Sequence, residues 1–169
     1  MKREQLEDLL ADLGIMSTIL EHPEVFTVEA MMPHLAGVDG LVCKNLFVRN
    51  KKKKLWLIVA KHDQEVNLND VAKNVKVSGG FRFADEKILY ETLGVRQGCV
   101  TPLALAEDTE GKVTLLLDAD LISEPSRFVY SHPMVNDASL GMAASDLLKF
   151  FQCINHEPVL VHFNSDKKT

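Results

Sequence analysis

The stretch LFVRNKKKKLWLIVA, residues 46–60, predicts two strands joined by a tight polar turn. Residues 55–60 form an unbroken apolar run, which is typical of a buried strand. Five cations fill the six positions 49–54, and such a cluster suits the solvent-exposed tip of a hairpin. An exposed tip is also where the phosphate backbone of a nucleic acid can make contact. A solvated turn and a phosphate contact are therefore both compatible with this pattern.

Patterns on either side of this hairpin predict alternating short strands and helices. Leucines at positions 6, 9, 10 and 13 mark one face of a helix that Gly14 ends. Later helices are predicted after the cap residues Thr27, Asn67, Asp85 and Ser145. Strands are expected over 15–20, 38–43, 46–49, 55–60, 81–83, 127–130, 138–142 and 158–163, and a second hairpin over 98–107 and 112–118. This alternation predicts one α/β (α+β) domain over residues 1–169 with a mixed sheet, and a frayed tail over 164–169.

The composition limits the possible partners and the compartment. The chain has 169 residues and a net charge of −5, so any contact with nucleic acid must come from a local patch. No apolar run approaches the ~20 residues that a membrane-spanning helix needs, so no membrane contact is expected. Cys43, Cys99 and Cys153 are odd in number and far apart, which favours buried or half-buried free thiols in a reducing compartment. We therefore expect a cytoplasmic protein.

Signatures of several enzyme classes are missing from the sequence. It contains no HExxH, GxSxG, Walker A or GxGxxG pattern, and its six histidines are scattered. Neither a metal site nor a cofactor is therefore expected. Asp118 and Asp120 form a carboxylate pair in a polar turn and are predicted to face water.

Lys44 stands apart from the lysine cluster. It precedes the apolar run LFV and is followed by the polar residue Asn45. A lysine is costly to bury, so its ammonium group either reaches solvent or is directed at a ligand. The pattern alone leaves both possibilities open.

Four separated segments carry a resemblance that extends over nearly the whole chain. They are EHPEVFTVEA (21–30), KNLFVRNKKKKLWLIVA (44–60), LGVRQGCVTPLAL (93–105) and SHPMVNDASLGM (131–142). Together and in this order they resemble the YbaK-like aminoacyl-tRNA deacylases, also called the prolyl-tRNA synthetase-associated domain. The KNLF and GxxxP forms look most like the free-standing branch that removes alanine from proline tRNA. The resemblance implies a mixed, mostly antiparallel sheet that is curled among surrounding helices.

The resemblance also implies where an active site lies. Lys44, Gly98 and His132 would serve catalysis. The residues implied to bind substrate are His22, Phe26, Thr27, Asn45, Pro102 and Asn136. The residues implied to contact tRNA phosphates are Lys51, Lys52, Lys53 and Lys54. Lys44 would contact the terminal nucleotide or stabilise the tetrahedral intermediate, and both roles stay open here. The segment NDASLGM departs from the more apolar strand of the family, which leaves the wall that selects the amino acid undetermined.

An aminoacyl ester is already activated, so its hydrolysis needs a positioned water and a stabilised oxyanion rather than a protein nucleophile. The resemblance implies a trans-editing hydrolase for mischarged tRNA, foremost Ala-tRNA(Pro). The alternatives are a deacylase for Cys- or Ser-charged tRNA and a non-catalytic module that binds tRNA or a synthetase. The expected partner is the RNA acceptor end of a mischarged tRNA. Prolyl-tRNA synthetase and an elongation factor are further candidates, and no DNA is expected.

Overall fold

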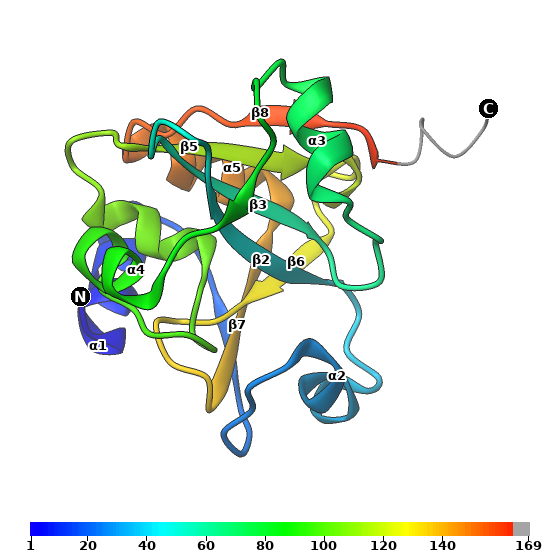
Figure 1. The fold of residues 1–169 in the computed structure, drawn as a ribbon. Helices are drawn as coiled ribbons and strands as arrows, with labels where there is room; N and C mark the ends of the chain where they lie inside the picture. The colour runs from blue at the N-terminus through cyan, green and yellow to red at the C-terminus, as the bar shows by residue number, and fades with distance from the viewer. Residues whose placement is uncertain (164–169) are drawn as a thin grey trace.

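The hairpin predicted from residues 46–60 lies at the centre of the fold. The computed structural model describes residues 1–163, so the expected frayed tail over 164–169 lies outside the described residues. Strands β2 (Leu41–Arg49) and β3 (Leu55–Lys61) pair antiparallel along the whole of β3 (Figure 1). β2 replaces the two shorter strands that the sequence predicted, because its polar residues at 44 and 45 keep the extended conformation.

The turn of this hairpin is formed by the lysine cluster. The Asn50 backbone carbonyl accepts a hydrogen bond from the Lys53 N–H at 3.1 Å, and the Asn50 side-chain oxygen accepts one from the Lys54 N–H at 2.9 Å. Lys53 has a φ of 65°, a left-handed conformation that a tight turn requires. The side chains of Lys51, Lys52, Lys53 and Lys54 are all exposed, which confirms the predicted solvent-exposed tip.

Eight strands of the described residues form one mixed sheet. Its order is β1-β7-β6-β2-β3-β5-β8, and β4 pairs with the end of β2. The remaining strands are β1 (Thr18–Glu21), β4 (Arg82–Phe83), β5 (Val113–Asp118), β6 (Phe128–Ser131), β7 (Ala138–Ala143) and β8 (Val159–Val161). The β1–β7, β6–β7, β2–β3 and β2–β4 pairings are antiparallel, and the other three are parallel. This mixed, mostly antiparallel sheet in an α/β arrangement confirms the predicted fold class.

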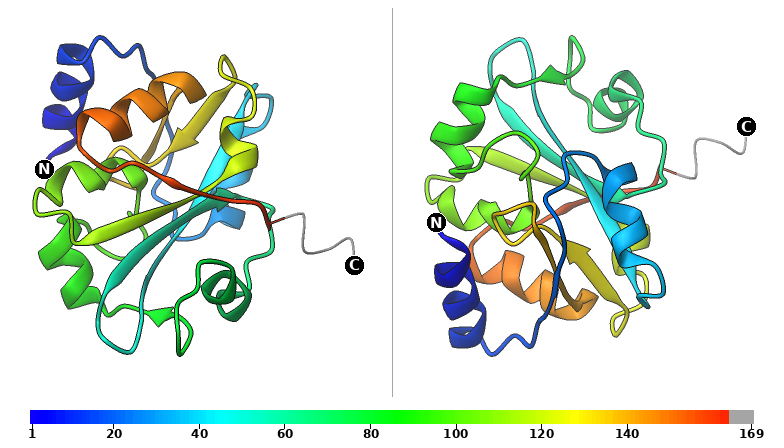
Figure 2. Two further views of the ribbon diagram at one scale, coloured as in Figure 1. Left: turned by 90° about the horizontal axis from the view of Figure 1, so that it is seen from above. Right: turned by 90° about the horizontal axis from the view of Figure 1, so that it is seen from below.

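Helices cover both faces of the sheet (Figure 2). One apolar core combines side chains of β2, β3 and β5 with those of α1 (Arg3–Asp12), α4 (Glu86–Leu93), the 3-10 helix η2 (Pro102–Glu107) and α5 (Ala144–Cys153). On the opposite face, α3 (Leu68–Asn74) packs against Val48, Trp56 and Ile58. The short elements α2 (Val28–Met31) and η1 (Met32–Leu35) pack beside the start of β2, and η3 (Ala119–Ile122) follows β5. None of the helices within residues 1–163 has the length and apolar character that crossing a bilayer requires.

Three of the four predicted helix caps are confirmed. Thr27, Asn67 and Asp85 each accept a side-chain hydrogen bond from the backbone N–H three residues later, at the starts of α2, α3 and α4. Ser145 is not a cap. α5 begins at Ala144, so Ser145 lies inside its first turn.

The second predicted hairpin is wrong. Residues 102–107 form the 3-10 helix η2 instead of a strand. Pro102 has no N–H to offer to a strand partner, and the Thr101 hydroxyl accepts a hydrogen bond from the Leu103 N–H at 3.3 Å. Local turn chemistry therefore overrides the apolar pattern of this segment.

Asp118 does not face water, contrary to the prediction. It is 1% exposed, and its carboxylate accepts hydrogen bonds from the backbone N–H groups of Lys61 and Asp120 at 3.2 and 3.0 Å. Burial raises the pKa of this carboxyl group. Asp118 therefore ties the end of β5 to the end of β3.

The three cysteines are free thiols with different degrees of burial. Cys43 is buried and Cys99 is half-buried, as predicted. Cys153 is exposed, contrary to the prediction, because it lies on the solvent side at the end of α5.

Candidate active site

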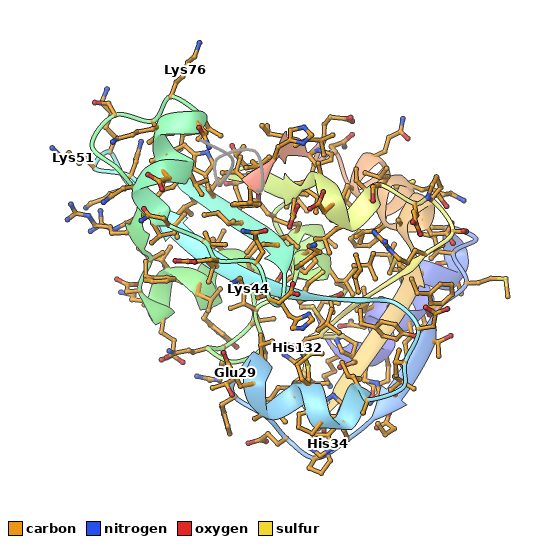
Figure 3. All side chains as sticks on the ribbon, turned by 90° about the vertical axis from the view of Figure 1, so that its right-hand side faces the viewer. Glu29, His34, Lys44, Lys51, Lys76 and His132 are labelled. Carbon is orange, nitrogen blue, oxygen red and sulfur yellow. The ribbon has the colours of Figure 1, made fainter. Side chains whose placement is uncertain are left out.

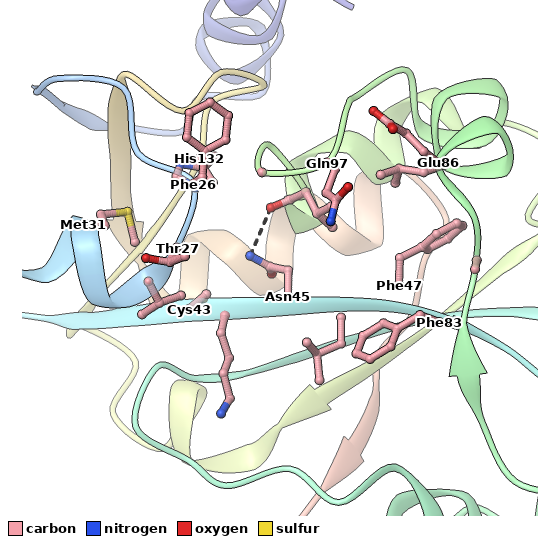
Figure 4. A pocket seen from close by; sticks show the side chains of 17 residues that line it. Phe26, Thr27, Met31, Cys43, Asn45, Phe47, Phe83, Glu86, Gln97 and His132 are labelled. Atoms are coloured by element: carbon pink, nitrogen blue, oxygen red, sulfur yellow. Dashed lines mark hydrogen bonds between the residues drawn. The ribbon is translucent and has the colours of Figure 1, made fainter.

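A gap in the sheet lies beside the middle of β2. On one side of this strand, β6 pairs with Leu41 and Val42, and β4 pairs with Val48 and Arg49. Between these points, no strand of the described chain pairs with this side of residues 43–47. A pocket of about 320 Å³ opens here, with walls from β2, β4, α2, α4 and the loop after α4 (Figure 4).

The backbone of Asn45 faces this gap. The Val42 carbonyl accepts a hydrogen bond from the His62 N–H on the β3 side at 2.8 Å, whereas the Phe47 carbonyl accepts one from the Ala84 N–H on the β4 side at 3.1 Å. Successive residues of an antiparallel strand direct their backbone groups to alternate sides. Asn45 therefore directs its N–H and carbonyl toward the gap, as Phe47 does.

The side chain of Asn45 adds an unsatisfied acceptor to the same pocket. Its Nδ2 donates a hydrogen bond to the Val100 carbonyl at 3.2 Å, which ties β2 to the loop after α4 (Figure 4). Its Oδ1 is buried and has no hydrogen-bond partner within residues 1–163. Leaving a buried carbonyl oxygen without a donor is costly, so a ligand donor that reached this atom would remove that cost.

Lys44 lies on the opposite face of β2 from Asn45. Side chains alternate along a strand, so Cys43, Asn45 and Phe47 share one face, and Lys44 and Leu46 share the other. Cys43 and Phe47 belong to the core under α1, α4 and α5, whereas Leu46 packs with the residues under α3. Lys44 is half-buried at the pocket and forms no ion pair with another described residue. The Lys44 side chain therefore borders the pocket from the second face of the strand.

Gly98 brings the loop after α4 against the segment before α2. Its φ of +90° lies in a region that glycine adopts easily. A Cβ at this position would lie 3.1 Å from Phe26 Cδ1 and 3.6 Å from Asn136 Nδ2. The missing side chain lets Phe26 approach the loop closely. Pro102 is buried at the start of η2, behind this loop, and is not part of the pocket wall.

His132 enters the pocket wall from the turn between β6 and β7. The ring is half-buried, and its Nδ1 lies 3.4 Å from the Ala138 carbonyl. Burial lowers the pKa of His132, so the ring is neutral at pH 7. With the proton on Nδ1 facing that carbonyl, Nε2 keeps a lone pair that can accept a hydrogen bond.

Asn136 and His22 lie outside the pocket lining and support its wall. Asn136 Nδ2 donates a hydrogen bond to the Val25 carbonyl at 2.7 Å, and the Val25 N–H donates one to the Asn136 carbonyl at 3.1 Å. His22 Nε2 is hydrogen-bonded to Ser139 Oγ at 3.0 Å. These contacts hold segment 22–27 on the β6–β7 turn.

The structure brings together six of the nine residues implied to serve catalysis or to bind substrate. Those that line the pocket are Phe26, Thr27, Lys44, Asn45, Gly98 and His132.

The four lysines implied to contact tRNA phosphates lie away from this pocket. Lys51, Lys52, Lys53 and Lys54 form the hairpin tip, and none of them lines the pocket. The tip begins about 20 Å along β2 from Asn45. Figure 3 shows Lys51 well separated from Lys44 and His132, toward the same end of the molecule as Lys76. A phosphate at the tip would therefore belong to a part of the ligand that lies outside the pocket.

The sequence predictions missed several residues of the pocket wall. They are Val28, Met31, Cys43, Leu46, Phe47, Phe83, Ala84, Glu86, Leu89, Gln97 and Val100. Strand alternation around KNLF could have placed Cys43 and Phe47 beside Asn45. Phe83 and Gln97 come from other elements, and no local pattern marks them.

Comparison with known proteins identifies the domain that carries this pocket. The family model described as the aminoacyl-tRNA editing domain matches residues 22–150. The chain belongs to this family. The matched range includes every residue of the pocket wall, so the pocket lies within the editing domain.

Relatives of this aminoacyl-tRNA editing domain cover most of the chain. Prolyl-tRNA synthetase associated domain-containing protein 1 of Xenopus laevis is 48% identical over 164 residues, which are 96% of this chain and 97% of that protein. Prolyl-tRNA editing protein ProX of Acetoanaerobium sticklandii is 32% identical over 142 residues, 83% of this chain and 84% of that protein. A crystal structure of a candidate trans-editing enzyme for prolyl tRNA synthetase has a TM-score of 0.68 at 19% identity, covering 95% of this chain and 94% of that chain. This last similarity shows a shared fold.

Proposed function

We propose that the protein is a trans-editing hydrolase that deacylates mischarged tRNA, with Ala-tRNA(Pro) as its preferred substrate. Membership of the aminoacyl-tRNA editing family supports the class of substrate. The relative named as a prolyl-tRNA editing protein supports the choice of proline tRNA. The observation that carries the proposal is the pocket beside β2, where Asn45 offers a buried oxygen without a donor and backbone groups without a strand partner.

Water is the nucleophile in this proposal. Cys43 lines the pocket, but burial raises the pKa of its thiol to about 12, so the thiol stays protonated at neutral pH. The lone pair on Nε2 of neutral His132 orients the attacking water. The backbone N–H of Asn45 donates to the developing oxyanion, and Asn45 Oδ1 accepts a hydrogen bond from the α-ammonium group of the aminoacyl ester.

Lys44 acts on the RNA rather than on the ester in this arrangement. It borders the pocket from the face of β2 opposite Asn45, so the acyl group and the ammonium group lie on different sides of the strand. A phosphate next to the terminal nucleotide is the anion that reaches this face. The proposed role of Lys44 is therefore to hold the 3′ end while the ester enters the pocket.

A panel of charged tRNAs tests the proposed function. Purified protein is mixed with tRNA(Pro) charged with alanine, cysteine, serine or proline, and release of the free amino acid is followed over time. We expect the fastest release from Ala-tRNA(Pro) and no acceleration with Pro-tRNA(Pro). Faster release of cysteine or serine would refute the substrate choice. Binding of the tRNAs without hydrolysis of any ester would instead identify a non-catalytic module.

Gly98→Ala is expected to slow deacylation by up to about 10²-fold, because the added Cβ displaces Phe26 and shifts the loop beside the ester. Gly111→Ala is the matched control: its φ is +68°, and nothing lies within 4 Å of an added Cβ. Both variants carry a backbone cost of about 1–2 kcal/mol. Single-turnover deacylation and thermal melting are measured for both. Equal losses of activity would show that Gly98 matters only for stability.

Replacement of Lys51, Lys52, Lys53 and Lys54 by alanine is expected to weaken tRNA binding while the single-turnover rate of bound substrate stays unchanged. The tip is exposed and distant from the pocket, so its cations can act only on the body of the tRNA. Each phosphate contact that is lost from a duplex should reduce the slope of log affinity against log salt by up to ~0.9. Binding is measured between low and moderate salt. An unchanged slope would mean that the four lysines form only a solvated turn.

A further inference from the structure

Two exposed aromatic rings flank the pocket. Phe26 is 69% exposed on the segment before α2, and Phe83 is 63% exposed on β4. Both belong to the pocket wall, and Figure 4 shows them on different sides of it. A large apolar side chain that stays this exposed at the mouth of a pocket gains stability when a ligand covers it.

The backbone around Phe83 is held firmly although its ring is exposed. Phe83 lies opposite Val48 in the β2–β4 pair, and the next residue, Ala84, donates its N–H to the Phe47 carbonyl at 3.1 Å. Residues that lie opposite each other share a face of the sheet. Phe83 therefore lies on the same face as Val48 and Lys44. A ring on a fixed backbone loses little conformational entropy when a flat partner binds it.

Phe83 also lies between Lys44 and the cationic hairpin tip. Val48, its partner on β2, is four residues from Lys44, or about 13 Å along the strand. It is only two residues from Asn50, where the hairpin turn begins. A cation on β2, an aromatic ring on β4 and the cluster of cations at the hairpin tip thus follow one another along this part of the sheet. Proteins that bind single-stranded nucleic acid combine these two elements, with cations along the backbone and rings on which bases stack.

We propose that Phe83 is a stacking platform for one unpaired base of the RNA strand, on the 5′ side of the terminal nucleotide whose ester enters the pocket. This inference rests on the proposed function, since it assumes that the ligand is the 3′ end of a tRNA. It adds a nucleobase subsite on β4, outside the space for the acyl group. Stacking uses the face of the base and reads none of its edges, so this subsite accepts the base regardless of its identity.

The first test measures binding of uncharged tRNA(Pro), which requires no catalysis. Phe83→Ala should weaken binding about 5- to 150-fold, which corresponds to the ~1–3 kcal/mol that stacking contributes per base. Phe83→Trp should restore the affinity, and Phe83→Leu, which is apolar but has no ring, should not. Tyr90→Ala is the matched control, because Tyr90 is 52% exposed on α4 and is not part of the pocket wall. Equal affinities of the parent and Phe83→Ala would overturn the proposal.

The second test locates the stacked base. An abasic nucleotide is placed at each unpaired position of the tRNA(Pro) 3′ end in turn, and each tRNA is bound to the parent and to Phe83→Ala. At the stacked position, the two changes together should weaken binding no more than either change alone. Additive losses at every unpaired position would overturn the proposal. All these tRNAs are uncharged, so the test does not depend on hydrolysis. If the parent protein failed to hydrolyse Ala-tRNA(Pro) but the abasic change and Phe83→Ala were non-additive in binding, only the proposed function would be overturned.

Discussion

Lys44→Ala is expected to lower kcat/KM for deacylation of Ala-tRNA(Pro) by about 10²-fold or more. Lys44 borders the pocket, and its ammonium group has no ion-pair partner in the described chain, so its removal leaves the fold intact. One cation among many adds little to overall tRNA affinity, whereas a small misplacement of the reacting ester is costly in rate. Single-turnover deacylation of the purified variant measures the effect. A well-folded Lys44→Ala protein that stays within threefold of the parent would show that Lys44 is structural.

The salt dependence of tRNA binding separates the two possible roles of Lys44. A contact with a phosphate of the single strand predicts that Lys44→Ala lowers the log–log salt slope by ~0.7. A contact with the tetrahedral intermediate predicts an unchanged slope and equal losses in kcat and kcat/KM. Strand alternation favours the phosphate, because Lys44 and Asn45 lie on opposite faces of β2. Lys87→Ala is a suitable control, since Lys87 is an exposed lysine on α4 outside the pocket wall.

Asn45→Ala is expected to lower kcat for deacylation by about 10²–10³, the loss typical of removing a preorganised polar group from an active site. The change removes the acceptor Oδ1, and it also removes the Nδ2 hydrogen bond that holds Val100. Rapid-quench measurements at saturating protein give the rate, and thermal melting serves as the control for folding. Activity that is unchanged in a folded variant would exclude Asn45 from the chemistry.

A modified substrate shows what the Asn45 oxygen binds. N-acetyl-alanyl-tRNA(Pro) has an amide in place of the α-ammonium group. If Oδ1 accepts a hydrogen bond from the ammonium group, the parent should hydrolyse this ester more slowly than Ala-tRNA(Pro), and Asn45→Ala should treat both alike. If the parent and Asn45→Ala showed the same ratio of rates for the two esters, Asn45 Oδ1 would not be the acceptor for the α-ammonium group.

Elements that depend on neighbouring residues were predictable from the sequence. The cationic turn, and the caps at Thr27, Asn67 and Asp85, follow from interactions within four residues, and all of them form. The prediction of a strand at η2 was wrong. The apolar pattern of this segment suits a strand, whereas the Thr101 cap and Pro102 favour a helical turn. Periodicity and turn chemistry conflicted there, and the turn chemistry decided.

The pocket was harder to predict from the sequence, because it is formed by contacts between residues that are distant along the chain. The resemblance placed Lys44, Asn45, Gly98 and His132 in one site, and the structure brings them to one pocket. The burial of Asp118 was missed because its hydrogen-bond partner at Lys61 is 57 residues away. Phe83 was missed because a short exposed strand gives no sign of the surface that it borders. Such positions become visible only when strand pairing is known.

The gap beside β2 also has a consequence for solubility. An uncovered strand edge exposes unpaired backbone groups that can pair with another chain, and proteins commonly protect such edges. Here the uncovered edge is limited to the few residues between β6 and β4. The loops that carry Phe26 and Gly98 form walls of the pocket at this edge. The walls that shape the pocket therefore also hinder edge-to-edge aggregation. A redesign that widens the pocket by shortening these loops would make the protein more prone to self-association.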